Sequence, residues 1–296
     1  MKRHSLILLF FFACTVKSLA QDNPAKVSVN VSTGFTRQNL SWSIAGNLAG
    51  KSPNIYSELQ WEKVGGQSLS SAVVWNFADR FLVAADYSHV FLSSGAVTDK
   101  DYSGDNRSNM VYNQRFNADK GHASAWSLGA GYQLVQTPKM RLNAFSGYRV
   151  NAQSLFILDR TGNFANLNST YSTKWKGPFV KATADYKIAA KLFLSAALSY
   201  NQVNYNAVSD WNLIPTFQHP VSYRHTAKGF GLDGELGLKY TFSKHVAIQA
   251  AAGYFSWKTG NGIDELFLEN GQTEKTQLNK VERTGFQTTA GLLFSF

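Results

Sequence analysis

The chain ends with Thr284-Gly285-Phe286-Gln287-Thr288-Thr289-Ala290-Gly291-Leu292-Leu293-Phe294-Ser295-Phe296, a stretch that alternates at period two. One face of an extended chain would carry Phe286, Ala290, Leu292, Phe294 and Phe296. The other face would carry Gly285, Gln287, Thr289, Gly291 and Ser295. Because successive side chains of a strand point to opposite faces, the pattern predicts a strand between an apolar environment and a tight polar one.

The same alternation recurs along the chain, at residues 81–91, 126–134, 192–200 and 232–242. In each case the polar face holds many Gly, Ala and Ser residues. The polar face of a soluble sandwich would be its wet exterior, whereas small residues suit the narrow, filled interior of a small barrel. Aromatic residues make up 14% of the chain and prolines number only six, which is typical of many amphipathic strands.

Short turns alternate with longer polar segments along the chain. The predicted turns lie at residues 76–80, 136–139, 189–191 and 242–245, and the predicted loops at 46–54, 94–121, 159–174, 207–222 and 259–280. This asymmetry is typical of outer-membrane barrels, which have tight periplasmic turns and longer external loops. Four turns, five loops and both termini on one side give ten strands. The expected fold is therefore all-β, a ten-stranded antiparallel transmembrane outer-membrane β-barrel.

The strand count depends on residues 55–76. This segment could be a hairpin that turns at Gly65-Gly66, which would give eleven strands. Because single-chain bacterial barrels have even strand numbers, we expect one long strand with a bulge at these glycines.

The first residues have the pattern of a secretory signal peptide. Lys2 and Arg3 precede an apolar run at residues 6–16, and a small-residue site follows, so we expect cleavage after Ala20. The expected organisation is a signal peptide at 1–20 and one barrel domain at 21–296. Cys14, the one cysteine, lies within the apolar run, and a lipoprotein with lipidated Cys14 is the alternative. A mature chain without thiols excludes disulfides and cysteine-based chemistry.

The net charge indicates which partners the chain could bind. Removal of Lys2, Arg3 and Lys17 with the signal peptide lowers the formal charge from +10 to +7. For an exported chain this surplus favours anionic lipid head groups as partners and not nucleic acid.

Ten strands are too few for an open aqueous channel. We expect the charged interior candidates to pair across the barrel, and these are Asp86, Arg149, Lys181, Asp185, Asp233, Glu235 and Lys239. Aromatic girdles are expected from Trp42, Trp61, Trp75, Trp126 and Trp175.

Asp99 and Asp101, in the second predicted loop, are the candidate catalytic carboxylates. Two carboxylates two residues apart on an extended chain point to the same side. Held close together they do not both ionise easily, so one keeps a proton and the couple can orient a water. The alternatives are a solvated turn and a calcium site that also uses Asp105. The expected set of protein-bound cofactors and metals is empty.

The stretch from Gly95 to Tyr102 resembles the signature of the omptins, a family of ten-stranded outer-membrane proteases: Asp-x-Asp and an aromatic, four residues after a glycine. The likeness in kind and place extends to residues 57–61, 128–132 and 288–292. The resemblance implies an aspartic-type endopeptidase in the outer membrane that acts on peptides or proteins. It also implies a role for lipopolysaccharide, whose phosphates Arg107, Arg115, Lys174 and Lys176 could hold; the simpler interpretation of these four residues is solvated surface charge.

Omptins place an Asp-x-His pair on a facing loop, where the His activates water. The resemblance assigns the orienting role to Asp210, but the position of the His is Asn212, which does not accept a proton. His219 is therefore the candidate base, and His225 is the alternative. The expected function is an omptin-like surface endopeptidase that uses Asp99, Asp101, Asp210 and His219. The competing functions are a non-catalytic barrel whose outer loops bind a surface partner or lipid, and a narrow pore.

Overall fold

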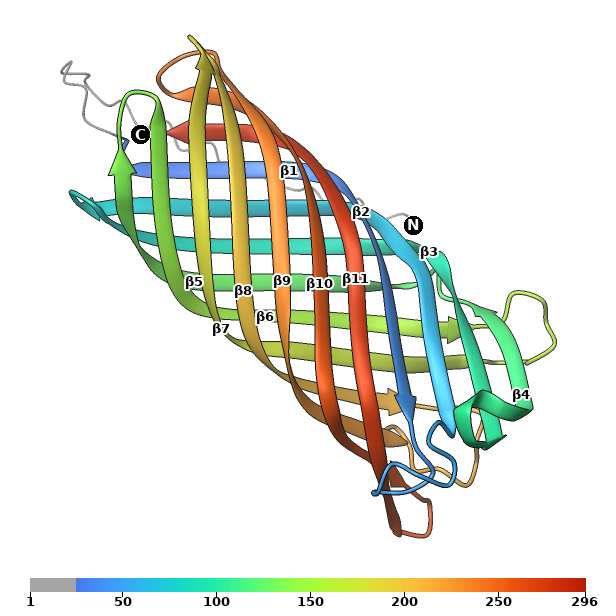
Figure 1. Ribbon diagram of the computed structural model, residues 1–296. Helices are drawn as coiled ribbons and strands as arrows, with labels where there is room; N and C mark the ends of the chain where they lie inside the picture. Colours follow the sequence, from blue (N-terminus) through green and yellow to red (C-terminus); the bar gives the residue numbers. More distant parts are fainter. Residues whose placement is uncertain (1–24) are drawn as a thin grey trace.

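A computed structural model describes residues 25–296 of the chain as one elongated β-barrel (Figure 1). Eleven strands form a single antiparallel sheet, as β1 (Val27–Ile44), β2 (Ser57–Ala78), β3 (Phe81–Gly104), β4 (Ser108–Asn117), β5 (Gly121–Gln136), β6 (Met140–Leu158), β7 (Asn168–Ala189), β8 (Leu192–Asp210), β9 (Tyr223–Thr241), β10 (Val246–Phe267) and β11 (Thr273–Ser295). One short 3-10 helix, η1 (Asp105–Arg107), joins β3 to β4. Residues 25–296 contain no helix long and apolar enough to cross a membrane. The expected signal peptide and Cys14 lie outside the described residues.

Ten of the eleven strands close the ring, which confirms the predicted ten-stranded barrel. Strand β1 pairs with both β2 and β11, so the last strand returns to the first. Strand β3 pairs with β5 over its first half and with β4 over its second half. Strand β4 is thus the return strand of a hairpin that extends beyond the ring, at the lower right of Figure 1. Residues 57–78 form one unbroken strand with register shifts at Gly65 and Gly66, as predicted.

The predicted loops are longer than the connections that the structure shows. Strand structure continues through most of residues 94–121 and 259–280, and the true connections are residues 45–56, 159–167, 211–222 and 268–272. In these segments both faces carry polar residues, because above the membrane neither face needs an apolar environment. The pattern of the sequence therefore shows a loop where the structure has a hydrogen-bonded hairpin. We call this end of the barrel the loop end and the opposite end the turn end.

The outer surface near the turn end is apolar. Large hydrophobic side chains that are at least about two-fifths exposed lie on every barrel strand there, and examples are Phe35, Leu69, Phe91, Leu128, Tyr148, Val180, Leu198, Leu236, Tyr254 and Phe286. Side chains this apolar and this exposed are stable in lipid. The ring of such residues is the membrane-facing band, and it leaves the loop end outside the membrane.

The prediction of aromatic girdles is correct for two tryptophans and wrong for three. Trp75 and Trp126 are 50% and 46% exposed on the outer surface. Trp42, Trp61 and Trp175 are instead buried inside the barrel, at the level where it rises above the membrane-facing band. They sit in a region that is closed on all sides by the other strands, so their rings stabilise the interior and do not contact lipid.

An aromatic layer fills the interior towards the loop end. Its members are Trp42, Trp61, Tyr171, Trp175, Tyr205, Tyr223 and Trp257, each at most 6% exposed. The rings touch across the barrel: Trp61 stacks on Tyr171 with centroids 5.1 Å apart, and Trp175 meets Trp257 edge to face at 6.0 Å. Each ring removes a large apolar area from water, so the layer is a main source of stability for this half.

The charged interior residues form two ion pairs. Arg149 Nη1 lies 3.0 Å from Asp233 Oδ2, and Lys239 Nζ lies 2.9 Å from Asp185 Oδ2. The expected pairing across the barrel is correct for these four residues. Asp86, Lys181 and Glu235 form no ion pair within the described part of the chain.

Candidate functional site

Two bulges at the base of the loop end decide which side chains face inward. Between the pairs Glu62↔Ala96 and Gly65↔Ser94, strand β2 has one extra residue. Between Gly65↔Ser94 and Gly66↔Leu92, strand β3 has one extra residue. A single extra residue reverses the alternation of faces beyond it. Both strands therefore exchange their inner and outer faces at the same level.

The exchange is visible in the burial of β3. Below the bulge the odd-numbered residues Tyr87 and Phe91 face lipid and are about half exposed. Above it the odd-numbered Val97 is fully buried and pairs with the buried Trp61 of β2. Gly95 lies at the bulge with a φ of 135°, and a Cβ there would come 2.8 Å from the Cα of Val64. This conformation and this contact require glycine.

The Asp couple, Asp99 and Asp101, faces the interior as a consequence of the bulge in β3. Asp99 pairs with Leu59, which is 1% exposed, and Asp101 pairs with Ser57. On the β4 side their partners are Gln114 and Tyr112. Cross-strand partners share a face of the sheet. The two carboxylates therefore lie side by side on the inner wall of the hairpin formed by β3 and β4.

The surroundings of the couple favour a proton on Asp99 near neutral pH. Burial, and then the neighbouring carboxylate of Asp101, raise the pKa of Asp99 from 3.8 to about 7. Burial also raises the pKa of Asp101, and a hydrogen bond from the Ser57 side chain opposes that change. Burial, followed by the two carboxylates, raises the pKa of Tyr112 to about 12, so its hydroxyl remains a donor. A carboxyl group that keeps its proton beside a second carboxyl group can orient a water.

A second carboxylate, Glu58, fixes the hairpin to β2. The Arg107 guanidinium donates to both oxygens of Glu58, at 2.8 to 3.1 Å, and the Tyr102 hydroxyl donates to Oε1 at 2.8 Å. Burial would raise the pKa of Glu58, but these hydrogen bonds outweigh it and hold the pKa below the ordinary value. Glu58 is thus an ionised anchor, and Arg107 forms a two-pronged ion pair with it.

The candidate base lies in the connection between β8 and β9. His219 Nδ1 is 2.6 Å from Asp210 Oδ1, so the imidazole and the orienting carboxylate are in direct contact. The loop is closed by a backbone hydrogen bond from Ser222 to Ser209 at 2.7 Å. It is also paired with the connection between β10 and β11 through a bridge between Phe217 and Leu268. With Nδ1 engaged by Asp210, Nε2 is the nitrogen left to accept a proton from water.

Asn212 has a structural role in the same loop. Its side-chain oxygen accepts hydrogen bonds from the backbone of Asn168 and from the Ser169 hydroxyl, both at 3.0 Å. Its side-chain nitrogen donates to the backbone of Asn166 at 2.8 Å. These three bonds hold the loop against the start of β7.

His225, the alternative base, is buried inside the barrel with no exposed surface. Its Nδ1 lies 2.8 Å from the Tyr171 hydroxyl, which is 2.7 Å from the Tyr205 hydroxyl. Its Nε2 lies 3.1 Å from Asp264 Oδ1, at an angle that does not make a hydrogen bond. Both ring nitrogens face buried partners inside the barrel, so this histidine has no open position for a water from outside.

The structure thus forms two separate pairs from the four predicted site residues. Asp99 lies beside Asp101, and Asp210 contacts His219. Within residues 25–296 no hydrogen bond or ion pair links one pair to the other. Asp99 does influence the buried Tyr223, and its charge contributes to raising the pKa of that hydroxyl after burial. Tyr223 also contacts Trp211, the residue after Asp210, with ring centroids 4.9 Å apart. The Tyr223 ring therefore packs against the start of the connection between β8 and β9.

Sequence reasoning missed Asp264 as an interior partner. Between Thr259↔Gly229 and Gly262↔Ala227, strand β10 has one extra residue, which turns the even-numbered Asp264 inward. The glycines at 260 and 262 are the signal that could have indicated a bulge.

Asp105, the third oxygen ligand of the calcium alternative, is engaged elsewhere. It accepts a hydrogen bond from the backbone of Asn54 at 2.7 Å and so ties η1 to the connection between β1 and β2. The described residues contain no group of three or more His, Cys, Asp or Glu side chains arranged to hold a metal ion.

Comparisons with known proteins identify a family and several barrels of similar structure. The family model described as "Pom: Protochlamydia outer membrane protein" matches residues 30–296. The outer membrane protease OmpT from Escherichia coli superposes with a TM-score of 0.74 at 17% identity, over 95% of this chain and 99% of that chain. No curated protein matches the chain significantly in sequence.

Two further barrels superpose less well. The translocator domain of the autotransporter NalP from Neisseria meningitidis has a TM-score of 0.41 at 12% identity, over 93% of this chain and 90% of that chain. The outer membrane protein OprG from Pseudomonas aeruginosa has a TM-score of 0.39 at 14% identity, over 92% and 97% of the two chains. At these identities the likeness concerns the barrel fold alone.

Proposed function

The chain belongs to the Protochlamydia outer membrane protein family and lies in the bacterial outer membrane, and for this member we propose cleavage of peptides at the cell surface by an omptin-like site. The observation that carries the proposal is the Asp couple. A bulge turns Asp99 and Asp101 into the loop end, and burial with mutual repulsion raises the pKa of Asp99 to about 7. Carboxylates in a solvated turn would neither face the interior nor have a raised pKa.

In the proposed reaction the two pairs have different roles. The protonated Asp99 donates a hydrogen bond to the oxygen of the scissile carbonyl, and Asp101 orients the attacking water. His219 takes the proton of that water on Nε2, while Asp210 holds Nδ1 and stabilises the imidazolium that forms. The same proton then passes to the leaving amine. Asp99, Asp101 and His219 are the catalytic residues, and Asp210 is a positioning residue.

The substrate would lie between the hairpin of β3 and β4 and the loop at 211–222. The hairpin is fixed to β2 by Glu58, and the loop at 211–222 is fixed to the hairpin of β10 and β11. Catalytic hydrogen bonds are often long in a free enzyme and shorten in the complex with substrate. A peptide that contacts both walls would bring the water between the two pairs.

Lipopolysaccharide is the proposed lipid partner. Lys174 and Lys176 lie on the outer face of β7, just above the exposed Val180 of the membrane-facing band. Neither lysine forms an ion pair within the described part of the chain. Two free ammonium groups at this level suit the phosphates of the outer leaflet. Arg107 and Arg115, which pair with Glu58 and Glu62, are the weaker candidates.

A non-catalytic surface barrel is the second candidate function. It is favoured by Asn212, whose three hydrogen bonds make it a structural residue where an omptin carries its base. In this case the Asp couple and the loops would bind a surface partner without chemistry.

The test is cleavage of a mixed peptide library by the refolded barrel with lipopolysaccharide. Wild type would be compared with Asp101→Asn, His219→Gln and, as a matched control, His245→Gln, whose imidazole lies at the turn end and contacts the Ser295 carbonyl at 2.8 Å. We expect cleavage by wild type and the control and about a hundredfold loss in the other two variants. A folded wild-type barrel that leaves every peptide intact would exclude the peptidase and favour the binding function.

A further inference from the structure

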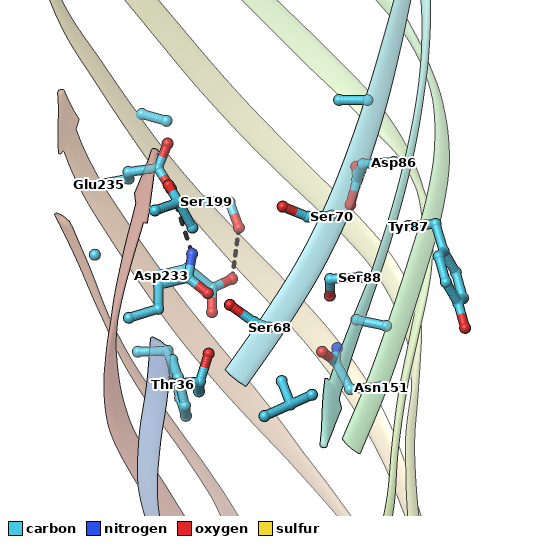
Figure 2. Close-up of a pocket in the computed structure, with 18 of the residues that line it drawn as sticks. Thr36, Ser68, Ser70, Asp86, Tyr87, Ser88, Asn151, Ser199, Asp233 and Glu235 are labelled. Carbon is cyan, nitrogen blue, oxygen red and sulfur yellow. Dashed lines mark hydrogen bonds between the residues drawn. The ribbon is translucent and has the colours of Figure 1, made fainter. Parts of the chain in front are cut away.

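The interior of the membrane-spanning half contains a polar cavity of about 380 Å³ (Figure 2). Its wall is rich in hydroxyl groups, which come from Ser32, Thr36, Ser68, Ser70, Ser88 and Ser199. Figure 2 shows Asp233 and Glu235 on one side of the view and Asp86 on the other. The volume falls in the range of small-molecule sites, which is roughly 300 to 1,000 Å³.

The cavity exists because the interior is filled unevenly. On the side of β3, β6 and β7, the buried Leu82, Phe145 and Phe179 pack into a small apolar cluster. On the opposite side the inward positions are small, as at Ser70, Gly253 and Thr289. The aromatic layer closes the cavity towards the loop end, with Trp257 and Phe255 in its wall. The turn end, which faces the periplasm, is therefore the side from which a solute would enter.

One charged group of the cavity, Asp233, has a complete set of partners. It accepts hydrogen bonds from Arg149 at 3.0 Å, Ser199 at 2.9 Å, Asn201 at 2.8 Å and the Trp257 indole at 2.8 Å. This pairing neutralises both Asp233 and Arg149. Neither of them needs a ligand.

Arg283 is a buried cation that forms no ion pair within the described chain, and the carboxylate that acts on it, Asp233, does so from beyond ion-pair distance. Its residue is 8% exposed, and its guanidinium lies over the Phe255 ring at 4.6 Å. The Nε donates to Gln38 Oε1 at 2.9 Å, and no ion pair of the described residues includes Arg283. A buried guanidinium is destabilising unless its charge and its donors are matched. A carboxylate in the cavity would meet both needs, because it fits the guanidinium fork in two parallel hydrogen bonds.

The cavity also holds carboxylates without a cation. Glu235 accepts one hydrogen bond, from Gln287 Nε2 at 3.3 Å. Asp86 accepts one from the Ser127 hydroxyl. Lys181, like Arg283, lines the cavity outside any ion pair of the described chain. Two unmatched charges of each sign thus face the same space.

Two neutral groups in the wall also lack partners. The Ser68 hydroxyl and the Asn151 side-chain nitrogen are buried polar atoms without a hydrogen bond in the described structure. Ser68 and Asn151 are 5% and 8% exposed, and both line the cavity (Figure 2). Buried polar groups in proteins are nearly always satisfied by protein, water or ligand.

We propose that this cavity binds a small zwitterionic solute, of the size of an amino acid or dipeptide, from the periplasmic side. Arg283 holds the carboxylate, Glu235 or Asp86 holds the ammonium group, and Ser68 and Asn151 bond to the polar body. A solute with both charges is selected, because an anion alone would leave the carboxylates of the wall unmatched and a cation alone would leave its cations unmatched. The site is separated from the Asp couple by the aromatic layer and is independent of any peptidase activity.

The test is isothermal titration calorimetry on the refolded full-length mature barrel in detergent. The three probes are L-alanyl-L-alanine, N-acetyl-L-alanine, which carries only the negative charge, and L-alaninamide, which carries only the positive charge. We expect the dipeptide to bind about tenfold or more tightly than either single-charge probe. Arg283→Gln should weaken dipeptide binding by about tenfold or more, and either Glu235→Gln or Asp86→Asn should weaken it as well.

Lys258→Gln is the matched control. Lys258 is the residue after Trp257 on β10, and it lies on the outer surface over the Phe230 ring at 5.2 Å, level with Arg283. Dipeptide binding should be unchanged in this variant. The shift in gel mobility between heated and unheated samples reports the folding of each barrel. If Arg283→Gln misfolds, Arg283→Lys replaces it, because lysine keeps the charge but lacks the two parallel donors of the guanidinium group.

Two results would overturn the proposal. Absence of saturable binding of all three probes to the folded wild type would mean that the cavity holds only water. Equal binding of the dipeptide and the acetylated probe, with no effect at Glu235 or Asp86, would mean a simple anion site.

Discussion

Replacing Asp99 with Asn should remove a pH dependence from the stability of the barrel. In the folded protein the pKa of Asp99 is raised from 3.8 to about 7, first by burial and then by Asp101. The folded state therefore holds a proton that the unfolded state releases between pH 4 and pH 7. The stabilisation is fully present below pH 4 and is lost as the pH rises through 7. Asn carries no charge at any pH, so the variant lacks this loss.

The size of the effect follows from the change in pKa. Each unit corresponds to about 1.4 kcal/mol, so a rise of about three units sets an upper limit of about 4 kcal/mol. Asp99 is only partly buried, and solvent screening reduces the expected value to about 2 kcal/mol. Removal of the neighbouring charge in Asp101→Asn should reduce the effect further but leave the larger part, because burial is the main cause.

The assay is urea unfolding of the refolded barrel between pH 4 and pH 9, followed by tryptophan fluorescence. Wild type should lose about 2 kcal/mol relative to Asp99→Asn between pH 4 and pH 8. Parallel pH profiles for the two proteins would show that Asp99 has an ordinary pKa. In that case the argument for an acid–base couple at the loop end would fail.

Three further predictions concern the anchor, the membrane-facing band and the aromatic layer. Glu58→Gln should lower the free energy of unfolding by about 2 kcal/mol at pH 7, because it weakens the bonds from Arg107 and Tyr102. Because the pKa of Glu58 is lowered in the folded state, this difference should shrink as the pH falls below 4.5, with the opposite sign to Asp99. Leu236→Arg should destabilise the barrel in lipid vesicles by about 2 to 4 kcal/mol, whereas Met110→Arg, also more than half exposed but on β4 beyond the membrane-facing band, should change stability by less than about 0.5 kcal/mol. Trp175→Ala should cost about 3 to 5 kcal/mol and should raise single-channel conductance in planar bilayers above that of wild type, and an unchanged conductance would show that the layer is not the barrier.

The sequence predicted the barrel because one rule governs most of it. In the membrane-facing band every strand must be apolar on one face, so the period of two is strict, as in the stretch at 284–296. The ten strands and the unbroken β2 could be derived from that rule together with the even strand number. The extent of the hairpins above the membrane could not, because water accepts polar residues on both faces and the pattern there loses its contrast.

The mispredicted positions lie beyond bulges, where the residues of a strand that face inward change from even-numbered to odd-numbered or the reverse. Trp61 was assigned to an outer girdle, yet the bulges in β2 and β3 turn it inward. Asp264 was not considered because the bulge before Gly262 on β10 turns it from the outer to the inner face. A bulge depends on which residues pair across two strands, and a single sequence carries only the hint of a glycine.

The site was predictable in its parts and not in its assembly. The sequence identified Asp99 with Asp101 and suggested that His219 could return to Asp210, and both neighbours are present in the structure. Their catalytic role stays a prediction. The placement of the two pairs relative to each other depends on long-range packing, for which no local pattern exists. Arg283 was missed altogether because a lone arginine in a polar stretch looks like a solvated residue.

The paired bulges in β2 and β3 also bear on how such a barrel could change over time. A single-residue insertion in a strand usually disrupts everything beyond it, because lipid-facing and interior residues exchange places. Here the two insertions lie at the same level, above the membrane-facing band, so the lower half keeps its phase whatever happens above. In β2 and β3 the bulges thus uncouple the two levels of the barrel: the side chains that face inward at the loop end can differ in phase from those that face inward within the membrane.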